Sequence, residues 1–66
     1  MQLVVNGQIR EVASDLTLRD LVEELALGPS KIAVELNGQV VPSSSWESTD
    51  LNEGDRVEIV HFVGGG

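Results

Sequence analysis

A chain of 66 residues can form one small domain, and folding buries only about 60% of the surface that such a chain exposes when unfolded. It contains no cysteine, which excludes disulfide bridges and thiolate chemistry of its own, and 11 acidic against 4 basic residues give a formal charge of −7. This charge argues against binding to nucleic acid, whose phosphates it would repel, and is compatible either with a basic docking surface on a protein partner or with solubility alone.

The N-terminal segment resembles neither a secretory signal nor a membrane anchor. Residues 1–8, MQLVVNGQ, lack a basic start followed by a long apolar run, and no apolar stretch approaches the roughly 20 residues that a membrane span needs. We therefore expect a soluble protein that does not contact membranes. The absence of cysteine favours the reducing cytoplasm as its location.

Two β-hairpins are predicted by Asn-Gly pairs. The first pair, Asn6-Gly7, lies between QLVV and QIREVA, and the second pair, Asn37-Gly38, lies between KIAVEL and QVV. Asn-Gly between apolar runs is the strongest short-range indication of a tight hairpin turn. Pro42 then ends the second hairpin.

The apolar residues of the first hairpin do not all share one face. Leu3 and Val5 do so by strand alternation, but Ile9 and Val12 lie at positions of different parity. We therefore expect a bulge or a register break in the second strand.

The segment LTLRDLVEELALGP, residues 16–29, is predicted to contain one α-helix with both ends marked. Thr17 can act as the N-cap, with Asp20 at the third helical position of a capping box. Gly28 followed by Pro29 is expected to end the helix. Four apolar residues recur at helical spacing and form one stripe, namely Leu18, Leu21, Val22 and Leu25.

The C-terminal third is predicted to contain a loop, a turn and a final strand. Residues 43–50, SSSWESTD, are expected to form a polar loop with one helical turn around Trp46. The segment LNEGD is typical of a tight turn, in which Gly54 is free to take a positive φ. The last strand follows as RVEIVHFV, residues 56–63.

The predicted order of elements is ββαβββ, and the single apolar stripe of the helix must pack on one face of a single sheet. We therefore expect an α+β fold of two layers, in which the last strand lies beside the first. This is a β-grasp (ubiquitin-like) roll, with a mixed sheet of four to five strands packed on one α-helix. The domain is expected to span residues 1–63, followed by a flexible glycine tail at residues 64–66.

The last predicted strand carries apolar residues on both faces. Val57 and Ile59 share the face expected to meet the helix, whereas Val60 and Phe62 point to the other side. Exposed apolar residues next to a chain end indicate a binding patch for a partner protein. In the alternative interpretation, the loop at residues 43–50 folds over Val60 and Phe62 and covers them.

Indications of catalysis are almost absent. The single histidine, His61, has no partner in the sequence and is expected to be a structural or rim residue. The acidic residues Asp50, Glu53 and Asp55 surround a turn, and a hydrophilic loop explains them better than a metal site. We expect neither a metal site nor an enzyme that acts alone.

The chain finishes in Gly64, Gly65 and Gly66, directly after the last predicted strand. We expect Gly66 to be the true C-terminus, with an ionised carboxylate at neutral pH. Glycine has no Cβ, so such a tail can enter a narrow channel in another protein. Three extended residues reach roughly 10 Å, which requires the folded domain to dock at the mouth of that channel.

Four segments resemble the ThiS family of sulfur carrier proteins in thiamine biosynthesis, and the resemblance runs nearly from end to end. The segments are MQLVVNGQ, VELNGQVVPSSSW, LNEGDRVEIV and HFVGGG. The family ends in Gly-Gly, and this chain carries a third glycine at Gly64 while the pair Gly65-Gly66 is intact.

The resemblance implies a function for the carboxylate of Gly66. In that family, a ThiF-like adenylating enzyme of the kind that activates ubiquitin uses ATP and magnesium to convert this carboxylate to an acyl-adenylate. Sulfur from a desulfurase system then replaces AMP and leaves a thiocarboxylate, from which thiazole synthase takes the sulfur. The resemblance implies that Gly64 and Gly65 thread into the partner and that the carrier binds no cofactor of its own.

Other functions remain open for the same tail. The chain could carry sulfur for molybdopterin or another metabolite, or it could be a ubiquitin-like modifier that is joined through Gly66 to a lysine of a target. A β-grasp interaction domain with an idle tail is the simplest alternative.

Overall fold

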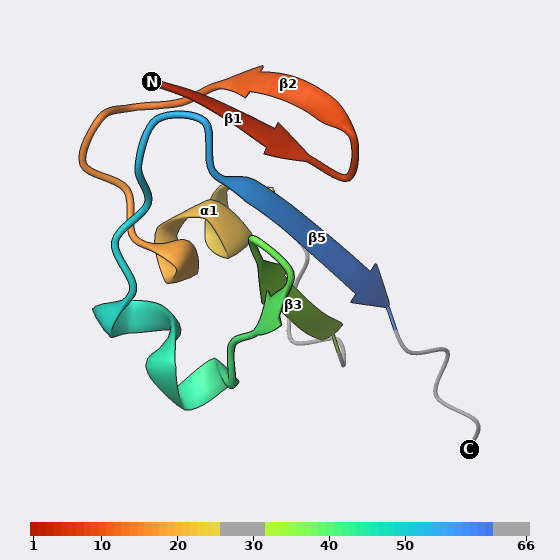
Figure 1. Cartoon of the computed structure of the whole chain (residues 1–66). Helices are drawn as coiled ribbons and strands as arrows, with labels where there is room; N and C mark the ends of the chain where they lie inside the picture. Colours follow the sequence, from red (N-terminus) through yellow and green to blue (C-terminus); the bar gives the residue numbers. More distant parts are fainter. Residues whose placement is uncertain (26–31, 62–66) are drawn as a thin grey trace.

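The computed structural model describes residues 1–25 and 32–61, and these form a five-stranded sheet with one α-helix. The sheet has the strand order β2-β1-β5-β3-β4 (Figure 1). This confirms the predicted mixed sheet and helix and sets the number of strands in the described part at five. The elements are β1 (Gln2–Val5), β2 (Gln8–Glu11), α1 (Leu18–Glu24), β3 (Ile32–Leu36), β4 (Gln39–Val40), the 3-10 helix η1 (Ser43–Ser48) and β5 (Arg56–His61).

The last strand lies beside the first, as predicted, and occupies the middle of the sheet. β5 runs parallel to β1, with Val57 opposite Val5, and antiparallel to β3, with Ile59 opposite Val34 (Figure 1). Both neighbouring strands therefore hold the strand that leads to the C-terminus.

Both predicted hairpins are present, and both turns have the backbone that Asn-Gly favours. Asn6 and Gly7 have φ values of 50° and 81°, and Asn37 and Gly38 have φ values of 50° and 86°. Positive φ at both central residues defines the type I′ turn, whose twist matches that of the flanking strands.

The predicted bulge in the second strand is wrong. The pairing of β1 with β2 is continuous, with Leu3 opposite Arg10 and Val4 opposite Ile9. It extends to Val12, whose backbone N–H donates to the Met1 carbonyl at 2.9 Å. The parity of Ile9 differs from that of Val12 because Ile9 points away from the core and is 70% exposed.

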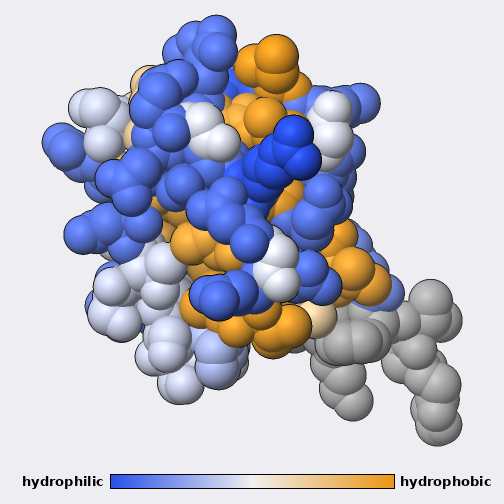
Figure 2. Space-filling model, viewed as in Figure 1, coloured by the Kyte–Doolittle hydropathy of each residue, from blue (hydrophilic) through white to orange (hydrophobic). Residues whose placement is uncertain are grey.

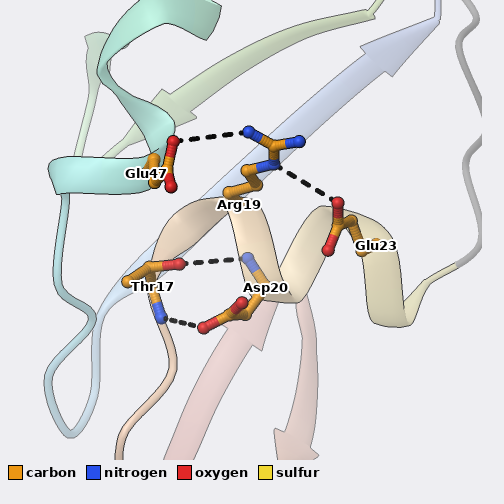
Figure 3. Close-up of polar contacts among 5 residues, drawn as sticks. All are labelled: Thr17, Arg19, Asp20, Glu23 and Glu47. Atoms are coloured by element: carbon orange, nitrogen blue, oxygen red, sulfur yellow. Dashed lines mark hydrogen bonds and ion pairs between the residues drawn. The ribbon is translucent and has the colours of Figure 1, made fainter.

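The helix begins as predicted and ends early. Thr17 and Asp20 form the full capping box, in which each side chain accepts a hydrogen bond from the backbone of the other at 3.1 Å (Figure 3). The helix ends at Glu24 with Leu25 as the C-cap, so it is shorter than the predicted segment. The expected stop at residues 28–29 lies outside the described residues.

The core lies between α1 and one face of the sheet. Leu18, Leu21 and Val22 of the predicted helical stripe are buried, and Leu25 packs against the cluster with partial exposure. The remaining buried residues come mainly from the three inner strands, and they are Leu3, Val5, Val34, Leu51, Val57 and Ile59.

The connection before β5 is fastened to this core. The expected helical turn around Trp46 is present as η1, and the indole N–H of Trp46 donates to the Val41 carbonyl at 2.8 Å. Arg19 of α1 contacts Glu23 at 3.3 Å and Glu47 of η1 at 3.4 Å (Figure 3). The Arg19–Glu47 pair, which joins α1 to η1, is largely exposed, so packing rather than charge is the main link between the two helices.

Among the described residues, no helix has both the length and the apolar character that crossing a membrane would require.

Candidate functional site

Only part of the predicted site lies within the described residues. The tail residues Gly64, Gly65 and Gly66, together with Phe62 of the predicted patch, lie outside the described residues. The structure therefore defines the strand that precedes the tail and the surfaces on both sides of it.

Strand β5 has the two-sided character that its sequence predicts. Val57 and Ile59 are 0% and 8% exposed and belong to the core. Glu58 and Val60 point to the opposite face, where Val60 is 53% exposed. A strand with one buried face has a strongly specified register, because a slip of one residue would expose its entire core side.

The asparagines of both hairpin turns hold β5 from either side. The side chain of Asn6 accepts a hydrogen bond from the backbone N–H of Ile59 at 2.7 Å. The side chain of Asn37 accepts one from the backbone N–H of Arg56 at 3.0 Å. Each asparagine thus supplies both the positive φ of its turn and a fixed partner for the central strand.

Sequence reasoning missed these contacts. It assigned the Asn-Gly pairs only to their turns, because neither pair is close in sequence to β5. The free amide side chain of a turn asparagine is the only sign of them in the sequence.

The acidic turn before β5 is a structural loop, as expected. The Asp55 carboxylate accepts from the Asn52 backbone N–H at 2.7 Å and from the Asn37 side-chain amide at 3.0 Å. Gly54 has a φ of 82°, and its N–H donates to the Gln2 carbonyl at 2.8 Å. No group of three or more potential metal ligands is found among the described residues.

The outer face of the sheet, defined as the face turned away from α1, carries the exposed apolar residues. Ile9 on β2, Val40 on β4 and Val60 on β5 are the large apolar side chains with more than half of their surface exposed in the described part of the chain. Figure 2 shows hydrophobic surface over β2 and beside the C-terminal end of β5, with hydrophilic residues between. The alternative in which the Trp46 loop covers Val60 is wrong, because Trp46 packs against the core instead.

Two carboxylates face each other in the middle of the outer face. Glu35 on β3 lies directly opposite Glu58 on β5 in the antiparallel register. A hollow of about 430 Å³ next to them is lined by Glu35, Asn37, Gly38, Arg56 and Glu58. Neither carboxylate takes part in an ion pair with another described residue.

His61 ends the described part of β5 on the helix side of the sheet. It is exposed and lines a hollow of about 210 Å³, whose apolar part is formed by Val5, Leu25 and Ile59. This agrees with the prediction of a rim residue. Arg10 of β2 lines the same hollow.

Comparison with known proteins shows similarity over the whole chain. The model of the ThiS family matches residues 3–66. The sulfur carrier protein ThiS of Bacillus subtilis (strain 168) is 36% identical over 65 residues, which cover 97% of this chain and 98% of that protein. The crystal structure of the thiamine biosynthesis protein ThiS from Geobacter metallireducens superposes with a TM-score of 0.86 at 36% identity, and the match covers 100% of both chains.

A longer protein is also similar. A thiazole synthase of Paramagnetospirillum magneticum is 44% identical over 66 residues, which cover 100% of this chain and 20% of that protein. The chain therefore spans about a fifth of the length of this relative. The family model includes the glycine end as well as the folded domain, and the chain belongs to the ThiS family.

Proposed function

We propose that the chain is a sulfur carrier of thiamine biosynthesis and that the carboxylate of Gly66 carries the sulfur. The observation that carries this proposal is the match of the ThiS family model over residues 3–66, which includes both the fold and the terminal glycines. The fold supports it, because the central strand β5 is held by strands on both sides and ends at His61, shortly before these glycines in the sequence.

The proposed chemistry uses a terminal carboxylate because this group is an anion at neutral pH. As an anion it attacks the α-phosphate of ATP and forms an acyl-adenylate, with release of pyrophosphate. The carboxylate itself resists attack by sulfur, whereas the adenylate offers AMP as a leaving group. Sulfur at the oxidation level of sulfide (HS⁻) then forms a C–S bond as the C–O bond to AMP breaks and a proton is lost, so Gly66 ends as a thiocarboxylate. A persulfide donor would first form an acyl disulfide, whose S–S bond a thiol then has to reduce.

In this proposal, the carrier delivers the reacting group and its partners supply the catalysis. A ThiF-like adenylating enzyme binds ATP and magnesium, a desulfurase system supplies sulfur, and thiazole synthase accepts it. Gly64 and Gly65 thread through the partner's channel, since glycine lets the backbone lie close to the walls. The carrier binds no cofactor, and the ATP-dependent step places it in the cytoplasm.

The folded domain has to offset the cost of ordering this tail. Fixing each backbone unit costs about 1–2 kcal/mol, so binding of the tail alone is unfavourable without other contacts. Val60, which is half-exposed at the end of β5, supplies part of these contacts, and we propose that Phe62 extends the same patch.

Sulfur transfer for thiazole is favoured over the other functions by the relatives. Two of the similar proteins are a sulfur carrier protein ThiS and a thiazole synthase. A carrier for molybdopterin would form the same thiocarboxylate and differ only in the acceptor of the sulfur. A ubiquitin-like modifier would use the same adenylate to become joined to a lysine of its target.

The test is the intact mass of the chain after incubation with ATP, magnesium, a ThiF-like enzyme and a sulfur source. The proposal predicts a mass increase that corresponds to one oxygen replaced by sulfur, located on Gly66. A variant that lacks Gly65 and Gly66 is the control and should stay unchanged. Covalent adducts with larger proteins would indicate a modifier, and an unchanged mass with a demonstrably active enzyme would contradict the proposal.

A further inference from the structure

We infer that the outer face of the sheet around Glu35 and Glu58 is the docking surface for thiazole synthase, and that it receives a basic side chain flanked by apolar ones. This inference rests on the proposed function, because it takes thiazole synthase as the protein that accepts the sulfur. It adds the face of the carrier that meets this enzyme and the chemistry of the contact.

The register of the strands places the exposed apolar residues on this face. Ile9 is opposite Val4, whose neighbours Leu3 and Val5 are buried, so Ile9 points to the outer side. Val60 follows the buried Ile59 on β5 and has the same orientation. Such residues scattered singly need no explanation, but a sheet face that collects them and that no helix of the described residues covers is typical of a protein-binding surface.

Val40 marks the other margin of the same face. It lies opposite Glu35 on β3, and residues that are directly opposite in an antiparallel pair point to the same side. The three exposed apolar side chains therefore stand around the two central carboxylates, at both edges of the sheet and at the C-terminal end of β5.

The pair of carboxylates destabilises the sheet of the chain when no partner is bound. Like charges directly opposite each other on neighbouring strands destabilise a sheet. Glu35 and Glu58 have this arrangement, and neither has a cation within ion-pair distance among the described residues. A cation from another protein would convert this repulsion into two attractive contacts.

The hollow next to the pair has room for such a group. Its volume of about 430 Å³ is lined by two carboxylates, one guanidinium from Arg56, and the turn at Asn37-Gly38. The lining has a net negative charge, which favours an arginine or lysine of the partner. Val40, which lies opposite Glu35 on the same face, adds exposed apolar surface beside the pair.

Two observations select thiazole synthase as the occupant. A segment similar to this whole chain forms a fifth of a protein named thiazole synthase. The identity to that segment is 44%, compared with 36% for the separate sulfur carrier protein ThiS of Bacillus subtilis. Five residues follow β5 in the sequence and span at most about 17 Å when fully extended, so the acceptor has to dock near the end of β5, where the outer face carries Val60.

The test compares two variants with the same change of charge. Glu58→Lys alters the outer face, whereas the control Glu24→Lys alters an exposed residue at the end of α1. Binding of each full-length chain to thiazole synthase from the same organism is measured by calorimetry, and thermal unfolding is measured alongside. We expect Glu58→Lys to weaken binding about tenfold or more relative to Glu24→Lys.

The same variant should change stability in the opposite direction. Glu58→Lys replaces the like-charge pair with Glu35 by an opposite-charge pair, so the melting temperature should stay the same or rise. Weakened binding by a chain that is at least as stable supports the inference. Binding within about twofold of the control would overturn it, and so would a wild-type chain that does not bind thiazole synthase.

These outcomes are separate from those of the proposed function. Conversion of Gly66 to a thiocarboxylate is read by intact mass and does not involve thiazole synthase. A chain that gains sulfur but docks through another face would reject the inference alone, whereas a chain that never gains sulfur would reject the proposed function.

Discussion

Both faces of the sheet carry apolar side chains, but only one face buries them in the core. On β5, Val57 and Ile59 are buried under α1, while their neighbours Glu58 and Val60 are exposed on the outer face. The buried side supplies the stability of a chain with a small core. The outer side exposes apolar surface that contributes little to stability, and it keeps two like charges opposite each other. The proposed docking of thiazole synthase on the outer face accounts for this difference.

Strand β5 is held by side-chain hydrogen bonds in addition to its backbone pairing with β1 and β3. The side chains of Asn6 and Asn37 reach from the two hairpin turns to backbone N–H groups of β5. A strand fixed in this way gives the tail a defined starting point.

The largest expected effect is a difference in the loss of stability between substitutions at two neighbouring residues of β5. Ile59→Ala removes a buried side chain and should lower the free energy of unfolding by about 2–5 kcal/mol. Val60→Ala should lower it by less than about 1 kcal/mol, because Val60 is half-exposed. Urea denaturation of both variants measures this difference. Equal losses would mean that the outer face also contributes to the core.

A smaller loss is expected when the asparagine contact to β5 is removed. Asn6→Gly keeps the positive φ of the turn but leaves the part-buried N–H of Ile59 without its partner, which costs about 1–2 kcal/mol. Asn6→Asp keeps an acceptor oxygen and serves as the control. Hydrogen exchange at the Ile59 amide should accelerate in the first variant and much less in the second, and unchanged protection in Asn6→Gly would contradict this role.

The smallest expected effect concerns the helix that covers the inner face. Thr17→Ala removes the N-cap and should destabilise the chain by about 1 kcal/mol, whereas Thr17→Ser keeps the hydroxyl that accepts from the Asp20 backbone N–H. Thermal unfolding measures both variants. Binding to thiazole synthase at a temperature where the chains are folded should be unaffected, because the cap lies away from the outer face.

Local chemistry made much of the fold predictable from the sequence. The two Asn-Gly turns and the capping box of Thr17 and Asp20 each have a short-range physical cause, and all are present. The bulge near Ile9 was wrongly predicted because the parity argument assumed that every apolar strand residue faces the core. Ile9 faces outward, and only the register of the sheet reveals this.

The features of the site that were missed depend on the order of strands. The contact from Asn6 to Ile59 joins residues 53 positions apart. The facing of Glu35 and Glu58 depends likewise on the pairing of β3 with β5. By contrast, the exposure of Val60 followed from alternation within one strand and was predicted correctly.

Transfer of labelled sulfur shows whether Gly66 delivers its sulfur to the thiazole ring. The chain is converted to its thiocarboxylate with a heavy isotope of sulfur and then mixed with thiazole synthase and its other substrates. We expect the heavy isotope to leave Gly66 and to appear in the thiazole ring. A thiazole product without the isotope, formed while the label stays on the chain, would contradict it.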